Sequence, residues 1–176
     1  MIYRFRVTLN GDENTYRDLE IEASNNFEDL HNVILQSFGF DGMEMASFYL
    51  TNEEWEPLEE ITLFDMSEDE EDRKLTMQES ILGEILHEEQ THLVYIYDFL
   101  SLWTFKIELT DQHERDPSTD YPKLLFAQGQ LDFQIESDSI IDDNDDEDPY
   151  GLDDDLGGSD IFDNLDDLED FDENWN

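Results

Sequence analysis

The chain has 176 residues, no cysteine and a formal net charge of −42, because 50 acidic residues accompany only eight Lys and Arg. A chain of this length can bury one hydrophobic core and carry an appendage. The absence of cysteine excludes disulfides, thiolate metal sites and cysteine nucleophiles. A surface this acidic repels phosphate backbones and anionic membranes, so we expect neither direct nucleic-acid binding nor membrane association.

Charge divides the chain into two parts. Every Lys and Arg lies before residue 124, whereas the residues from Asp138 onward include 18 acidic residues and no basic one. We therefore predict a domain at 1–136 and an acidic, disordered tail at 137–176, since self-repulsion opposes ordering. No apolar run is long enough to span a bilayer and the first residues lack a signal-peptide pattern, so we expect a cytoplasmic protein.

The tail has two features that bear on binding. Its apolar residues recur every three or four positions from Ile161 to Trp175, a pattern that could fold as a helix on a partner or on the domain. A purely solubilising tail is the alternative. A calcium loop started at Asp142 lacks the required glycine and final glutamate. One started at Asp153 has Gly157 at a ligand position and Asn164 in place of the glutamate, so we predict only weak, nonspecific divalent binding.

Alternating apolar residues predict a β-hairpin at the start of the chain. Residues 2–9 and 16–23 form its strands, with turn-forming residues at 10–14. Folding back brings Arg4 and Arg6 close to acidic residues of the second strand. Such cross-strand pairs neutralise two of the few arginines and leave no basic patch for nucleic acid. The acidic residues are Asp18, Glu20 and Glu22.

Two helices are expected after the hairpin. The first carries apolar residues from Phe27 to Phe38, ends at Gly39, and begins at Asn25 or Asn26, where Asn25 and Glu28 have capping-box spacing. A strand at 45–51 follows. The second helix is predicted to open at Thr76, with Glu79 at capping-box spacing, although Gly83 interrupts it.

The most apolar and aromatic stretch, 91–109, predicts a second hairpin. Its first strand has Leu93, Tyr95, Tyr97 and Phe99 on one face and Val94 and Ile96 on the other. Apolar residues on both faces are typical of a central strand covered on both sides. Its second strand has one apolar and one polar face. A short apolar run at 124–127 indicates a last strand or a packed loop. The fold class is therefore α+β: one small domain with a mainly antiparallel sheet packed by one or two helices.

Several short motifs resemble the plasmid pRiA4b ORF-three-like family, an insertion-element passenger type of domain. These motifs are Leu30-His31, Phe38-Gly39-Phe40, Tyr97-Asp98-Phe99 with Trp103, and Tyr121-Pro122. The resemblance extends over about residues 1–135 and implies a shared fold. It implies no activity, and this chain is identified as a divergent member.

The departures concern polar residues. Leu100-Ser101-Leu102 stands where the family has Gly-Asp-Asp, and Phe105 stands where the family has His after the Trp. The family's later Cys and Pro-Pro-Glu-Asp segment is absent, and a family His is replaced near Glu44. A site that depended on those residues would be lost here.

Catalytic patterns are missing. The sequence has no G-x-S-x-G elbow and no glycine-rich phosphate loop. His87 and His92 could converge with Glu88 and Glu89 on a metal, but solvated turn residues explain them more simply. We predict no catalytic, cofactor-binding or metal-binding residue and no cofactor.

One candidate pocket remains, formed by Asp98, Trp103, His31 and Tyr97. A carboxylate among aromatic rings could have a raised pKa if it were buried without a cation. The alternative is that Asp98 accepts backbone N–H groups in its turn or pairs with Lys106 or an arginine. His31 lies at the edge of the helix's apolar face, where a hydrogen-bonded boundary histidine is expected.

Two functions follow from these observations. We expect a non-catalytic interaction protein whose acidic surface and tail engage basic partners. The alternative is a small-ligand binder or cryptic enzyme with a pocket near Asp98, Trp103 and His31.

Overall fold

The computed structural model describes residues 1–68, 71 and 73–133, so the tail predicted at 137–176 lies outside the described residues. The described chain is an α+β domain with one eight-stranded sheet and two helices, as predicted. The elements are β1 (Ile2–Leu9), β2 (Asp12–Glu22), α1 (Phe27–Phe38), β3 (Ala46–Thr51), β4 (Pro57–Thr62), β5 (Leu75–Thr76), α2 (Leu82–Ile85), β6 (His92–Tyr97), β7 (Trp103–His113) and β8 (Lys123–Gln128).

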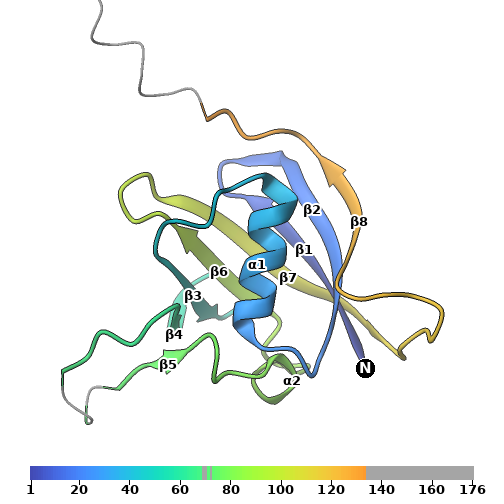
Figure 1. Cartoon of the computed structure of the whole chain (residues 1–176), viewed down its shortest axis with the longest axis horizontal. Helices are drawn as coiled ribbons and strands as arrows, with labels where there is room; N and C mark the ends of the chain where they lie inside the picture. The colour runs from blue at the N-terminus through green and yellow to red at the C-terminus, as the bar shows by residue number, and fades with distance from the viewer. Residues whose placement is uncertain (69–70, 72, 134–176) are drawn as a thin grey trace, which may run out of the picture. The chain divides into compact units, whose positions relative to one another are not determined.

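The sheet is antiparallel except at one end. Its strand order is β5-β4-β3-β6-β7-β1-β2-β8, and only the β4–β5 pair is parallel. The helix α1 lies across one face of this sheet, and β8 forms the edge beside β2 (Figure 1). The two predicted hairpins, β1–β2 and β6–β7, are both present and pair with each other through β1 and β7. Neither helix of the described chain has the length and apolar character that crossing a bilayer requires.

The face of the sheet under α1 forms the hydrophobic core. Alternate residues of the central strands point to it and are fully buried, and α1 contributes its apolar side. The strand residues include Phe5, Val7, Leu19, Ile21, Phe48, Leu93, Tyr95, Phe105 and Ile107. The opposite face, which we call the open face, carries polar and charged residues, with Arg4 bonded to Glu20 and Arg6 to Asp18, as the hairpin predicted.

The strand β6 is central, but the prediction that it is covered on both sides is wrong. Val94 and Ile96 lie on the open face and are only half-buried. The strand also ends at Tyr97, so Phe99 lies in the following turn and is 44% exposed. Apolar residues on the second face of this strand therefore do not mark a second packed layer over the described sheet.

The helix α1 begins one residue later than the Asn25–Glu28 capping box would place it. Asn26 has the extended backbone of an N-cap, and its side chain accepts the N–H of Asp29 at 2.9 Å. The Asp29 carboxylate accepts the N–H of Asn26 at 3.2 Å, which completes the box. Gly39 ends the helix with φ of 84°, the left-handed conformation that glycine adopts without strain.

The second helix is much shorter than predicted. Leu75–Thr76 pairs with β4 as a strand, and α2 contains only four residues. The N–H of Met77 donates to the carbonyl of Thr62 at 2.8 Å, so the backbone here bonds to β4 and not within a helical turn. Gly83 then packs against the backbone of Ala23, where an added Cβ would lie 3.0 Å from the carbonyl oxygen.

One buried cation joins three parts of the fold. Arg17 lies on the core side of β2 and is only 6% exposed. Its guanidinium donates to the carbonyls of Ser37 at 2.8 Å, in the last turn of α1, and of Gln128 at 2.6 Å and Gly129 at 3.1 Å, at the end of β8. It also lies 4.4 Å from the ring centre of Phe38. A cation at a helix C-terminus is favoured by the helix dipole.

We predict that Arg17→Met lowers the free energy of unfolding by about 2–3 kcal/mol, because buried carbonyls lose a charged donor. Arg115→Met is the matched control, since Arg115 pairs with Glu22 on the surface and its loss should lower that free energy by less than about 1 kcal/mol. Urea unfolding followed by far-UV circular dichroism measures both. Equal effects of the two substitutions would contradict the role given to Arg17.

Candidate functional site

Two of the four predicted pocket residues lie together. Tyr97 and Trp103 are directly paired on β6 and β7, and both rings contact Phe40, with ring centres 4.6 and 5.6 Å apart. Trp103 also contacts Phe133 at 5.9 Å. The hydroxyl of Tyr97 donates to Asp41 at 2.9 Å. This group is an aromatic cluster that packs the segments after α1 and β8 against the sheet.

His31 makes its contact in the core, on α1. Its Nδ1 lies 2.7 Å from the hydroxyl of Tyr95, and both residues are buried. Burial lowers the pKa of His31 to about 4, so the imidazole is neutral at pH 7. Burial also raises the pKa of Tyr95, so its hydroxyl keeps its proton. The pair is a neutral hydrogen bond within the core.

Asp98 acts as an acceptor in its own turn. The pKa of Asp98 is lowered by hydrogen bonds, first from the side chain of Ser101 and next from the N–H of Leu100, which lies 3.0 Å from the carboxylate. The backbone of Asp98 has φ of 57°, a conformation that Asp tolerates better than most residues. A lowered pKa is the opposite of what a general acid needs near neutral pH.

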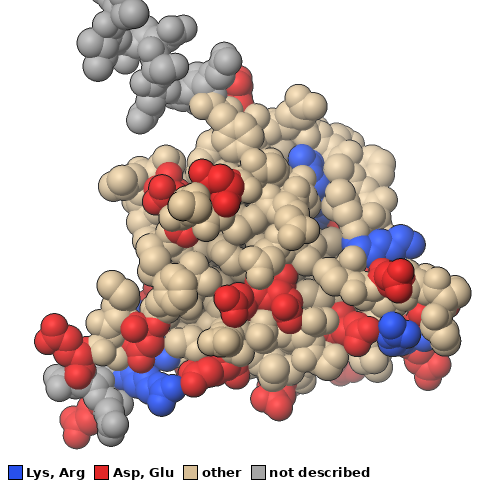
Figure 2. All heavy atoms as spheres, in the orientation of Figure 1, with Lys and Arg blue, Asp and Glu red and all other residues tan. Residues whose placement is uncertain are grey.

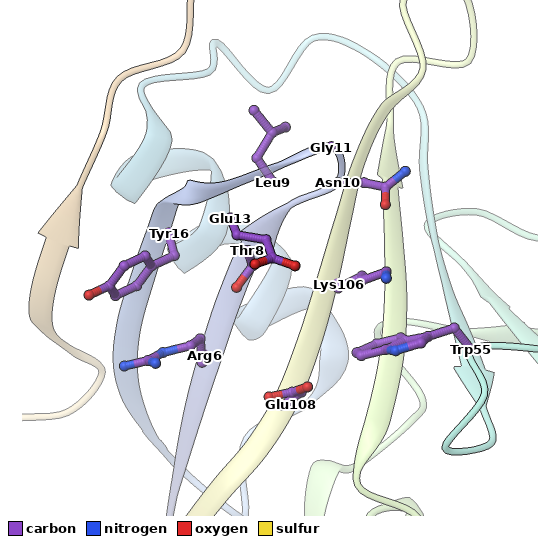
Figure 3. Close-up of a pocket in the computed structure, with 10 residues that line it drawn as sticks. All are labelled: Arg6, Thr8, Leu9, Asn10, Gly11, Glu13, Tyr16, Trp55, Lys106 and Glu108. Carbon is purple, nitrogen blue, oxygen red and sulfur yellow. The ribbon is translucent and has the colours of Figure 1, made fainter.

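A groove lies on the open face. Its volume is about 560 Å³, and it is lined by Arg6, Thr8, Leu9, Asn10, Gly11, Glu13, Tyr16, Trp55, Lys106 and Glu108. Figure 3 shows Tyr16 and Arg6 at one side, Trp55 and Lys106 at the other, and Glu13 and Glu108 between them. A second hollow of about 330 Å³ lies near Ser47 and Phe99. Neither hollow is lined by Asp98, Trp103, His31 or Tyr97.

Cations lie on aromatic rings at both sides of the groove. The guanidinium of Arg6 is 4.5 Å from the ring centre of Tyr16, and the ammonium of Lys106 is 4.9 Å from that of Trp55. Arg6 also forms two bonds of 2.8 Å to the carboxylate of Asp18. Among the described residues, no carboxylate lies within ion-pair distance of Lys106, whose ammonium contacts the face of the Trp55 ring.

The position of Trp55 is unusual for a large residue. Its φ is 65°, in the left-handed region that bulky side chains rarely enter. The turn between β3 and β4 holds it there, because the side-chain oxygen of Asn52 accepts the N–H groups of Glu54 and Glu56 at 3.0 and 2.9 Å. The ring contacts His92 at 4.9 Å. Backbone strain of this kind is concentrated at functional sites in proteins.

The sequence alone did not single out the groove. Lys106 belongs to the polar face predicted for 103–109, but Trp55 lies in a stretch without clear periodicity. The one sequence feature that could have indicated the groove is the turn at Asn52, because this turn holds Trp55 in place. The order of strands in the sheet decides which residues line the groove, because β1 and β7 are far apart in the sequence and adjacent only in the folded chain.

The fold and open face define a class: a small α+β domain with an antiparallel sheet, one covered face and one charged face. The chain belongs to the plasmid pRiA4b ORF-3-like protein family, whose sequence model matches residues 1–137. No curated protein matches its sequence.

A solved structure has a similar fold. It is the crystal structure of a protein of unknown function, MM3350, from Methanosarcina mazei Go1. The match has a TM-score of 0.61 and 20% sequence identity, and it covers 72% of this chain and 68% of that one. At this identity the likeness concerns the fold alone.

We predict that His31 makes the domain sensitive to mild acid. Its folded-state pKa of about 4 lies below the usual 6.5, so the unfolded chain binds more protons between these values. Stability is therefore lost as the pH falls from 6.5 toward 4, by about 3 kcal/mol from this residue. The His31→Gln variant keeps a partner for Tyr95 but does not titrate.

Urea unfolding of both proteins at several pH values isolates this effect, because the carboxylates titrate alike in the two chains. As the pH falls, the free energy of unfolding of the wild type should decrease more than that of His31→Gln. A difference that stays constant from pH 7 to 4.5 would contradict a neutral, buried His31.

Proposed function

We propose that this chain is a non-catalytic interaction protein whose acidic surface and tail engage a basic partner. The observation that carries the proposal is where the cations lie. Five of the eight form ion pairs with acidic residues within the domain, namely Arg4, Arg6, Arg73, Lys74 and Arg115. Arg17 bonds to buried carbonyls, and Lys106 lies on Trp55.

The acidic residues are left in large excess. Before Asp138 the chain has 32 acidic and eight basic residues, and from Asp138 onward it has 18 acidic residues and no basic one. On the face drawn in Figure 2, acidic side chains are spread over the surface and outnumber the basic ones. A field of one sign attracts a basic surface over about a Debye length and speeds its association.

This arrangement favours a protein partner over a nucleic acid. Phosphate binding needs several unpaired Lys or Arg on one surface, and here most of the cations are already bonded internally. We also propose that the tail stays disordered until it binds and that the protein acts in the cytoplasm.

The first test measures binding of a labelled arginine-rich peptide to the full-length chain at increasing salt. We predict an affinity that falls steeply with NaCl, because the attraction is electrostatic. Replacing the 18 acidic residues from Asp138 onward by Asn and Gln should weaken binding roughly tenfold, because that removes much of the field.

A glutamate-rich peptide of the same length is the control and should not bind. If the neutral-tail variant bound the basic peptide as tightly as wild type, the tail would have no part in recognition. If neither protein bound it at 50–150 mM salt, the proposal of a basic partner would be wrong.

The groove supports a second function, the binding of a small ligand. It combines an ammonium, Lys106, with the carboxylates of Glu13 and Glu108 and with the rings of Tyr16 and Trp55. A zwitterion with a planar group, such as an aromatic amino acid, would satisfy both signs of charge. This location is better supported than a pocket near Asp98, whose carboxylate is bonded within its turn.

For this second function, thermal-shift measurements with L-tryptophan, L-tyrosine and L-phenylalanine should raise the melting temperature of the wild type. Lys106→Met should abolish the shift, because the ligand carboxylate loses its cation. Lys123→Met, an exposed lysine outside the groove, is the control and should keep the shift. No shift with any of the three would argue against a zwitterion site.

A further inference from the structure

The edge strand β8 is unusual for its exposed apolar surface. It ends the sheet, and in the described part of the chain no strand pairs with its outer side. Leu124, Leu125 and Phe126 are 44%, 38% and 49% exposed. Soluble proteins usually protect such an edge with charges, prolines, bulges or very short strands, and of these β8 has one bulge and one lysine. The opposite edge, β5, has only two residues, whereas β8 has six and a single charge, Lys123.

The strand is nevertheless firmly positioned. Arg17 bonds the carbonyls of Gln128 and Gly129 at its end, and Phe126 stacks on Tyr16 of β2 with ring centres 5.7 Å apart. Gly129 has φ of 72° and passes so close to Thr15 that a Cβ would overlap it. Leu124 and Phe126 pair with adjacent residues of β2, so Leu125 between them forms a bulge and adds an apolar residue at the surface. An edge fixed in advance loses little entropy on binding.

Carboxylates lie in the sequence beyond both ends of β8. Asp116 and Asp120 precede the strand, Asp132 follows it, and all three are exposed. None forms an ion pair with another described residue. The 18 acidic residues of the tail begin at Asp138, ten positions after the strand ends. The edge is thus apolar in its middle and acidic in its flanking segments.

We propose that β8 receives an extended segment of the basic partner as a ninth strand. This inference rests on the proposed function and specifies its binding mode. The segment would be apolar in the middle, to cover Leu124, Leu125 and Phe126, and would carry Lys or Arg at its ends. Main-chain hydrogen bonds to the free edge provide affinity, and the side chains provide selectivity.

The tail and the edge then have different tasks. The charge of the tail attracts the basic flanks from a distance and speeds the encounter of the segment with the protein. The edge selects a segment that can extend as a strand. A second copy of this chain is a poor occupant, because two chains of charge −42 repel each other.

The experiment compares two labelled peptides on the full-length protein. Both have three lysines at each end; one has six alternating valines and threonines between them, and the other has glycines and serines. We expect the valine peptide to bind about tenfold more tightly, because only it can form the added strand. Hydrogen exchange should slow in Lys123–Gln128 with the valine peptide and not with the glycine peptide.

Variants separate the edge from the tail. Leu125→Thr with Phe126→Thr should remove the preference for the valine peptide while leaving the affinity for the glycine peptide unchanged. The matched control is Leu100→Thr with Phe64→Thr, which removes the same two residue types from exposed positions elsewhere and should keep the preference. Circular dichroism and melting temperature confirm that each variant is folded.

The outcomes distinguish this inference from the proposed function. Equal binding of both peptides, or no protection of β8, would overturn the strand-addition mode while basic-partner binding remained. Binding of neither peptide would overturn the proposed function as well. A stable dimer in light scattering that Leu125→Thr with Phe126→Thr dissolves would show a second copy on the edge and would also overturn the inference.

Discussion

A shortage of cations is the constraint on which this structure depends. Eight Lys and Arg accompany 50 acidic residues, and the most buried of the eight, Arg17, has no carboxylate partner in the described residues. Its guanidinium bonds carbonyls of α1 and of the end of β8. Backbone carbonyls and the face of the Phe38 ring stabilise this charge, so one side chain ties the end of β8 to the last turn of α1.

The same shortage shapes the open face of the sheet. Arg4 and Arg6 bond acidic residues of the neighbouring strand β2, and His113 shares Glu20 with Arg4 at 3.0 Å. These pairs permit a charged sheet face to stay folded without a second layer. They also use the cations that an anion-binding surface would need. The features available for binding a partner are the acidic surface, the groove on the open face with its charges of both signs, and the exposed apolar edge of β8.

Local patterns predicted most of the fold, because each hairpin and α1 follow from side-chain alternation and capping residues. The errors arose where distant contacts decide the structure. Leu75–Thr76 became a strand because β4 offers it a partner, and Phe99 left the strand because Asp98 turns the chain. Of the candidate site, the sequence indicated that Asp98 could be a turn acceptor and His31 a hydrogen-bonded boundary histidine, whereas His31 is buried in the core. It could not show the groove or the free edge, because both depend on strand order.

Mapping the binding surface by NMR tests whether a basic segment binds at the β8 edge and the acidic tail. Isotope-labelled full-length protein is titrated with the lysine-flanked valine peptide, and backbone shifts are followed for every residue. We expect changes in Lys123–Gln128 and in the acidic residues from Asp138 onward, with Tyr97, Asp98 and Trp103 unchanged. Changes confined to Asp98 and its neighbours, with β8 unaffected, would contradict this expectation.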